Sequence, residues 1–97
     1  MSNADADTTH MGDVTNVVSL AEMRAGLTGR IVRIDGGHGL YAKLEAMGIR
    51  EGQDITKVSG HWMRGPVLLR RNNTQVALGF GMARRIIVQL SRKSDER

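Results

Sequence analysis

Short runs in which apolar and polar residues alternate make up much of the chain, and this pattern predicts β-strands. In the run TGRIVRIDG, Val32 and Ile34 fall on one face, and Arg33 and Asp35 on the other. Four further apolar runs follow, each short enough for a single strand. Their sequences are DITKVS, PVLLRR, TQVALG and RRIIVQL. The pattern therefore predicts five short strands.

Two features predict where these strands depart from a regular ladder. Ile55 and Val58 are an odd number of residues apart, so strict alternation cannot bury both side chains. We therefore expect a bulge or a twist between them. Asn72 and Asn73 separate two apolar runs. Because asparagine tolerates positive φ, we expect a two-residue hairpin turn there.

The segment HGLYAKLEAMGI has the period of a helix. Leu40, Leu44 and Met47 stand at i, i+4 and i+7 and form one apolar stripe, which predicts an inserted helix over about residues 39–47. A five-stranded sheet of this length avoids exposed edges best by curling into a small barrel. We therefore expect a mainly β fold, a small five-stranded barrel with one helix after the first strand.

Two glycines follow this helix. Gly48 falls at the position just past its end, where a left-handed residue terminates a helix at little cost. Ile49 then falls where it can contact Leu44, the usual hydrophobic contact of such a cap. Gly52 is expected to make the turn into the next strand.

A short helical turn is expected near the start of the folded part. Ser19 and Glu22 have the spacing of a capping box, and Gly26 ends the segment. We divide the chain into a disordered N-terminal arm at 1–16, a folded domain at 17–90 and a frayed tail at 91–97. The predicted core consists of Val32, Ile34, Leu40, Leu44, Met47, Val67, Leu69, Val76, Leu78, Ile86 and Val88.

Composition narrows the class of protein. The chain has 97 residues, which suits one domain, and it has no cysteine, which excludes disulfides and thiolate metal sites. It contains neither an apolar run of the ~20 residues that span a bilayer nor a secretory signal. We therefore expect a cytoplasmic protein. The net charge of +4 favours an acidic partner, anionic lipid or nucleic acid, or simply a solvated surface.

Between Ser19 and Leu90, the order and spacing of glycines, a Gly-Pro pair and apolar residues resemble those of the FeoA family. Its members are small proteins that accompany the ferrous iron transporter FeoB. The family pattern has a leucine and a glycine at a helix end, a second glycine before a strand, a Gly-Pro pair opening the next strand and a final ALG…A..I.V segment. The matching residues are Leu44, Gly48, Gly52, Gly65, Pro66, Ala77, Leu78, Gly79, Ala83, Ile86 and Val88.

The resemblance implies an SH3-like barrel with an inserted helix. It also implies an accessory or regulatory role in bacterial ferrous iron uptake, as a cytoplasmic partner of FeoB at the inner face of the membrane. The same fold occurs as the C-terminal module of repressors of the diphtheria-toxin-repressor type. The matched positions are mostly glycines and core residues, so the resemblance carries over a fold rather than functional side chains.

We expect no enzymatic activity. The sequence contains neither a Gly-x-Ser-x-Gly motif nor a cysteine nucleophile. The segment GGHGLYAK has glycines before a helix, an arrangement that can bind an anion. It lacks the G-x-x-x-x-G-K-[ST] order of a phosphate loop, so we interpret its glycines as a turn.

A dedicated metal site is not expected either. His10, His38 and His61 are the histidines of the chain, and none lies three or four residues from another. His38 and His61 are the candidate metal ligands, with Asp35 and Glu45 as sources of oxygen ligands. The predicted cofactor requirement is none, with weak binding of a divalent ion such as Fe²⁺ or Zn²⁺.

The segment GHWMRGP contains the candidate partner-binding residues Trp62, Met63 and Arg64. Tryptophan and arginine are enriched at binding hot spots, and methionine adapts to irregular surfaces. Leu40 and Tyr41, at the start of the helix, are expected to extend this surface. The expected partner is the cytoplasmic part of FeoB or a second copy of this chain. The alternative is that Trp62 folds over the barrel as a lid on the core.

A second function is compatible with the same sequence. A basic SH3-like module can bind nucleic acid, and the segment TGRIVRIDGGHGL suits the strand and loop of such modules. Two features oppose this alternative. The helix directly after the loop is foreign to those modules, and one Trp, one Tyr and one Phe cannot build a stacking platform of several aromatics.

Overall fold

The computed structural model describes residues 16–60 and 64–91 of the chain. The arm expected at 1–16 and the tail expected at 91–97 lie outside these residues, apart from Asn16 and Ser91. The same is true of Trp62, Met63 and His61. Within the described ranges there is no helix long and apolar enough to cross a membrane.

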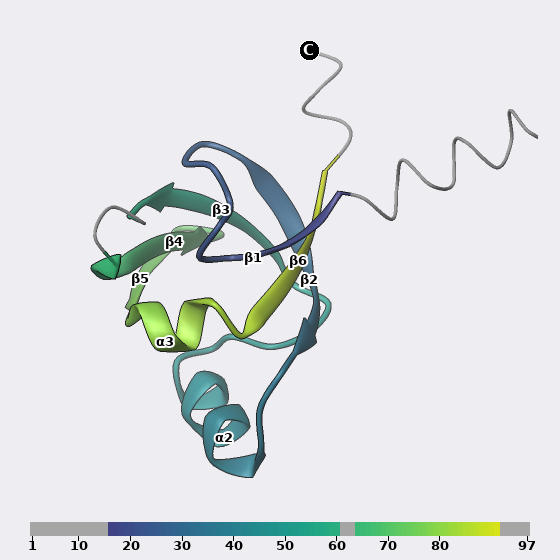
Figure 1. Cartoon of the computed structure of the whole chain (residues 1–97), viewed down its shortest axis with the longest axis vertical. Coiled ribbons are helices and arrows are strands. Elements are labelled where there is room, and N and C mark those ends of the chain that lie inside the picture. Colours follow the sequence, from purple (N-terminus) through teal and green to yellow (C-terminus); the bar gives the residue numbers. More distant parts are fainter. Residues whose placement is uncertain (1–15, 61–63, 92–97) are drawn as a thin grey trace, which may run out of the picture.

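The described residues form one antiparallel sheet with two short helices (Figure 1). The strand order is β1-β6-β2-β3-β4-β5. The strands are β1 (Val17–Ser19), β2 (Thr28–Ile34), β3 (Asp54–Ser59), β4 (Val67–Arg71), β5 (Thr74–Leu78) and β6 (Ile86–Leu90), and the helices are α2 (His38–Ala46) and α3 (Phe80–Ala83).

The predicted class, a small mainly β fold of the SH3-like type with an inserted helix, is confirmed. In Figure 1 the strands curve around a common interior, and α2 projects from one end of the molecule below α3. The sheet has one strand more than predicted, because the three-residue β1 pairs with β6. A strand this short has too few residues for its alternation to be recognised in the sequence.

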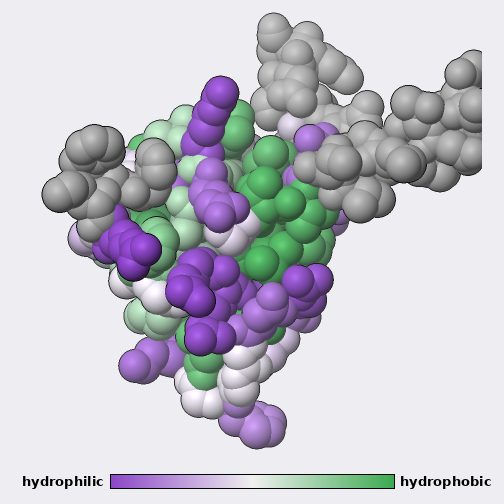
Figure 2. Space-filling view, in the orientation of Figure 1, coloured by the Kyte–Doolittle hydropathy of each residue, from purple (hydrophilic) through white to green (hydrophobic). Residues whose placement is uncertain are grey.

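The predicted core position of Val32 is wrong. The register of β2 against β6 shifts between Ile31 and Arg33, so Val32 lies in a bulge. The bulge lets Ile31 and Ile34 both face the core, although they are an odd number of residues apart. Val32 is therefore 41% exposed. Figure 2 shows a hydrophobic surface over β1, β6 and β2.

The irregularity expected in β3 is confirmed, but its burial pattern differs from the expected one. The register against β4 shifts between Lys57 and Ser59. Ile55 and Lys57 face the core, whereas Val58 is half-buried. The hairpin expected at Asn72 is also confirmed, because Arg71 pairs directly with Thr74 across a two-residue turn and Asn72 has a φ of 57°.

The helix α2 ends as predicted. Gly48 has a φ of 81°, in the left-handed region. Its N–H donates to the carbonyl of Glu45, and the N–H of Ile49 donates to the carbonyl of Leu44, each over 2.9 Å. This pair of bonds is a Schellman motif. Gly52 likewise has a positive φ, of 92°, in the turn before β3.

The core lies between the strands and is closed by the N-terminal turn. Seven predicted positions are buried, namely Ile34, Leu44, Val67, Leu69, Leu78, Ile86 and Val88. Three more, Leu40, Met47 and Val76, are half-buried against them. The prediction missed Leu20, Ala21, Met23, Ile31, Ile49, Ile55 and Ala83.

A buried lysine holds the N-terminal turn in place. Lys57 is 0% exposed, and its ammonium group donates to the carbonyls of Leu20, Ala21 and Met23 over 2.7–3.0 Å. Burial lowers the pKa of Lys57. The hydroxyl of Ser19 accepts a bond from the N–H of Glu22 over 3.2 Å, as the capping spacing predicted. The turn is therefore fixed at both ends.

Candidate functional site

The described part of the predicted partner surface begins with Arg64. This residue has a φ of 58°, a backbone angle that is unusual for residues other than glycine and asparagine. Its guanidinium carbon lies 5.7 Å from the centre of the Phe80 ring, at the start of α3. A cation over an aromatic face is an attractive contact. Arg64 is therefore held against α3 while its side chain remains exposed.

Leu40 and Tyr41 lie in the first turn of α2 and have different environments. Leu40 is half-buried and packs against the core. Tyr41 is 38% exposed, and its hydroxyl donates to the carboxylate of Glu51 over 2.5 Å. Glu51 also accepts a bond from the N–H of Ile34 over 3.2 Å. The hydrogen bond to Glu51 is the main reason that the pKa of Tyr41 is raised.

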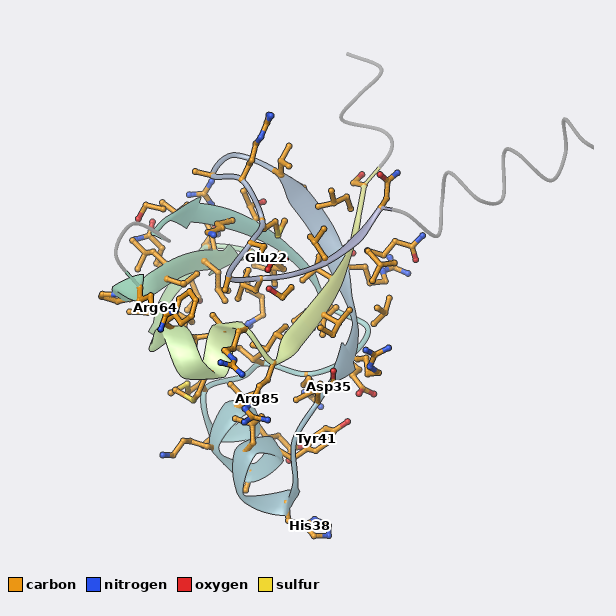
Figure 3. All side chains as sticks on the ribbon, in the orientation of Figure 1. Glu22, Asp35, His38, Tyr41, Arg64 and Arg85 are labelled. Atoms are coloured by element: carbon orange, nitrogen blue, oxygen red, sulfur yellow. The ribbon has the colours of Figure 1, made fainter. Side chains whose placement is uncertain are left out.

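Of the predicted partner residues, the structure describes Arg64, Leu40 and Tyr41, and these three do not form one continuous patch. Figure 3 shows Arg64 beside α3 on one side of the molecule and Tyr41 on α2, well away from it. Leu40 lies closer to α3, because it lines a groove between the two helices. Arg64 is not among the residues that line this groove.

This groove, which we call the α2–α3 groove, has a volume of about 680 Å³. Its lining includes Leu40, Gly79, Gly81, Met82, Arg84 and Arg85. Figure 3 shows Arg85 in the space between α3 and α2. One guanidinium nitrogen of Arg85 donates to the backbone carbonyl of Asp35 over 3.3 Å. Figure 2 shows a hydrophilic surface around the junction of α3 and β6, above α2.

The charged pairs of the described residues lie on exposed surface and tie neighbouring strands and loops. Arg30 and Asp54 bridge β2 and β3 over 3.0 Å. Arg33 and Asp35 bridge the end of β2 over 2.7 Å, and this hydrogen bond lowers the pKa of Asp35. Exposed pairs of this kind contribute little to stability. We interpret them as surface pairs rather than as a reactive site.

The candidate metal ligands do not form a cluster in the part of the chain that the structure describes. His38 is exposed as the first residue of α2, and Figure 3 shows it at the tip of the molecule, away from the sheet. Asp35 is engaged by Arg33. Among residues 16–60 and 64–91 there is no group of three or more His, Cys, Asp or Glu side chains that could hold a metal ion.

Sequence reasoning missed the α2–α3 groove, although part of it had a signal. The segment GFGMARR places two glycines and two arginines within seven residues. The segment GGHGL supplies the opposite wall through Leu40. The two segments are about forty residues apart in the sequence. Their approach therefore follows from the sheet topology, which periodicity along the chain does not give.

Comparison with known families gives one match, the FeoA domain, over residues 18–90. A similar solved structure is the crystal structure of an iron uptake regulatory protein (FeoA). It has 36% sequence identity to the chain and a TM-score of 0.72, and the match covers 77% of this chain and 99% of that one. A comparison with curated proteins found no match.

Two further solved structures share the fold. The solution structure of iron(II) transport protein A from Clostridium thermocellum has 26% identity and a TM-score of 0.69, with 75% of this chain and 45% of that chain covered. A manganese-dependent transcriptional repressor has 22% identity and a TM-score of 0.71, with 77% and 42% covered. At this identity the repressor shows only that the fold is shared.

Proposed function

The chain belongs to the FeoA domain family, accessory proteins with a part in ferrous iron transport, and from this premise we propose that it acts by direct contact with the cytoplasmic part of a FeoB-type transporter. In this role it catalyses no reaction itself. It works in the cytoplasm, at the inner face of the membrane to which its partner brings it.

The observation that carries this proposal is the extent of the family match. Residues 18–90 take in β2 to β6, both helices and all but the first residue of β1. The solved FeoA structure is covered over 99% of its length at 36% identity. The likeness therefore spans nearly all of the fold, which supports a shared role.

The proposed contact surface consists of Trp62, Met63, Arg64, Leu40 and Tyr41. Arg64 and Tyr41 are exposed, and the Tyr41 ring stays accessible although its hydroxyl is bonded to Glu51. Arginine and aromatic side chains of this kind form the anchors of protein interfaces. A small barrel without a deep ligand cavity offers surfaces of this sort rather than an enclosed site.

The role of iron in this proposal belongs to the partner. Iron is the cargo of the transporter, and the chain requires no cofactor of its own. The exposed position of His38 and its distance from the sheet support this view, because a dedicated site needs several ligands held together.

The experiment that tests the proposal is co-purification. The affinity-tagged chain is expressed with the FeoB-type transporter of the same organism, and the membranes are solubilised in mild detergent. We expect the transporter to elute with the tagged chain in stoichiometric amount, with or without added nucleotide. Elution of the tagged chain alone, from membranes that contain the transporter, would contradict the proposal.

A gel-shift assay tests the alternative function. The +4 charge favours nucleic acid in general, but the described residues offer no aromatic stacking platform. We expect neither RNA nor DNA to be shifted at moderate ionic strength, where unspecific phosphate contacts weaken. A specific shift that persists there would favour the nucleic-acid-binding alternative.

A further inference from the structure

Two of the glycines that line the α2–α3 groove, Gly79 and Gly81, are not required by the fold. A Cβ atom added at Gly79 or Gly81 meets no heavy atom within 4 Å, and neither residue has a positive φ. Gly81 lies inside α3, where alanine is more favourable than glycine. What glycine provides at these positions is a bare backbone, which allows close approach by atoms from outside the chain.

The groove combines apolar walls with positive charge. Leu40 and Met82 are half-buried and contribute the apolar surface. Arg84 and Arg85 are exposed in its lining. Among the described residues, Arg84 has neither an ion pair nor a side-chain hydrogen bond, and Arg85 uses one N–H on a backbone carbonyl. Several guanidinium donors therefore face solvent unpaired.

The neighbouring carboxylate does not neutralise this charge. Asp35 lies close enough to Arg85 for the arginine to help lower its pKa. Its carboxylate, however, is held by two hydrogen bonds from Arg33, of 2.7 and 3.2 Å. The groove therefore keeps a net positive rim that an acidic ligand would complement.

We propose that the α2–α3 groove binds an acidic segment of the transporter's cytoplasmic part. Carboxylate side chains of that segment pair with Arg84 and Arg85, since the guanidinium fork matches a carboxylate in shape and charge. An apolar residue of the segment packs between Leu40 and Met82, over the bare backbone of Gly81. This inference rests on the proposed function and adds to it the site and the chemistry of the contact.

The lining of the groove favours a peptide over nucleic acid. Proteins that hold single strands stack the bases on aromatic side chains. The residues that line this groove are glycines, two apolar side chains and two arginines, without an aromatic ring. Apolar walls between two charged groups suit a segment that mixes acidic and apolar side chains.

The first test reverses the charge of the rim. The probe is the detergent-solubilised FeoB-type transporter, titrated with the wild-type chain and with the double variant Arg84→Glu/Arg85→Glu. We expect the variant to bind about a hundredfold more weakly, on the order of tenfold for each lost pair. The matched control is Arg24→Glu/Arg50→Glu, which makes the same change in net charge at exposed residues outside the groove. The control is expected to retain most of the affinity.

The second test fills the groove without changing charge. Gly81→Leu places a side chain in open space within the lining, and we expect at least about tenfold weaker binding. Gly39→Leu is its control, because Gly39 also has open space around it but lies outside the lining. Both variants are expected to keep the melting temperature of the wild type, since a Cβ atom at either position meets no heavy atom within 4 Å.

The outcomes separate this inference from the proposed function. If the wild type binds the transporter and the groove variants bind equally well, the inference is overturned while the proposed function stands. If the folded wild type does not bind at all, both fall. If the arginine variant instead loses affinity for RNA or DNA and keeps its affinity for the transporter, the groove serves nucleic acid and the inference is wrong.

Discussion

At the scale of single residues, the most informative side chain is Lys57, which takes a core position in β3. A buried ammonium group is costly unless its donors are satisfied. Here three backbone carbonyls accept its three N–H groups. These carbonyls belong to the turn at residues 20–23, which contributes Leu20 and Met23 to the core. The lysine side chain therefore links β3 to this turn, beside the backbone bonds of Lys57 to Gly26 and Leu27.

Replacing Lys57 with methionine should destabilise the domain. The Lys57→Met variant keeps a long apolar side chain but leaves the buried carbonyls without their donor, so we expect a loss of about 2 kcal/mol or more. Chemical denaturation measures this free energy of unfolding. Lys43→Met, at an exposed position of α2, is the matched control and should change stability little. Equal stability of the two variants would show that the carbonyls find other donors.

Gly48 gives a second prediction at this scale. Its left-handed φ disfavours any side chain, and an added Cβ would lie 2.5 Å from a guanidinium nitrogen of Arg71, which must move. Gly48→Ala should therefore cost on the order of 1 kcal/mol. Gly39→Ala, within the same helix and in open space, should be neutral or slightly stabilising. Thermal melting of both variants compares them, and an unchanged midpoint for Gly48→Ala would mean that the helix does not need this cap.

The histidines give a third prediction. Because His38 is exposed and belongs to no cluster among the described residues, the purified chain should bind divalent ions weakly and without selectivity. Anaerobic titration with Fe²⁺ and Zn²⁺, compared with His38→Ala and His61→Ala, measures this. Tight stoichiometric binding that either substitution abolishes would refute the prediction.

At the scale of elements, the sequence predicts best where a local rule is sufficient. The apolar stripe of α2, its glycine stop and the Asn72 turn each depend on a few neighbouring residues, and each is found where expected. In β2 the prediction holds for Ile34 and is wrong for Val32, because the bulge at Val32 depends on pairing with β6, which is distant in sequence. Strict alternation assigns the wrong face wherever a bulge adds a residue.

The bulge in β2 predicts an unequal response to two neighbouring truncations. Ile31→Ala removes a fully buried side chain and should cost about 3 kcal/mol. Val32→Ala changes a side chain that is 41% exposed and should cost about 0.5 kcal/mol or less. Denaturant unfolding of the two variants decides the register. A larger loss for Val32→Ala would place Val32 in the core and contradict the observed bulge.

The candidate site could be predicted only in part, for the same reason. Leu40 and Tyr41 follow from the helix, and Arg64 from a segment that stood out by composition. The meeting of Leu40 with Met82 and Arg85 across the α2–α3 groove could not be predicted, because the order β6-β2 brings the ends of distant segments together. No local pattern in the sequence explains the glycines and arginines of GFGMARR. Their place in a groove follows only once Leu40 is known to lie opposite them.

At the scale of the whole molecule, the proposed function belongs to the outer surface. Among residues 16–60 and 64–91 the core is filled by apolar side chains and Lys57, which leaves loops, helices and a groove on the surface for a partner. The chain has a positive net charge, and two of its arginines, Arg84 and Arg85, are exposed in the groove between α2 and α3.

Trp62 distinguishes a contact surface from a lid on the core. If it anchors the partner, Trp62→Ala should weaken association by about 2 kcal/mol or more, while the melting temperature stays unchanged. If it covers the core, stability should fall, and binding should be lost only as the fold is lost. Melting temperature and partner affinity of this one variant decide between the two, and a stable variant that binds normally would exclude both.

The measurement that tests the central claim most directly is a calorimetric titration of the purified FeoB-type transporter, in detergent, with the purified wild-type chain. The claim that the chain acts by direct contact predicts saturable binding at a defined stoichiometry. It also predicts that Arg84→Glu/Arg85→Glu weakens this binding and that Arg24→Glu/Arg50→Glu does not. A folded chain that shows no saturable binding to an active transporter would contradict the account.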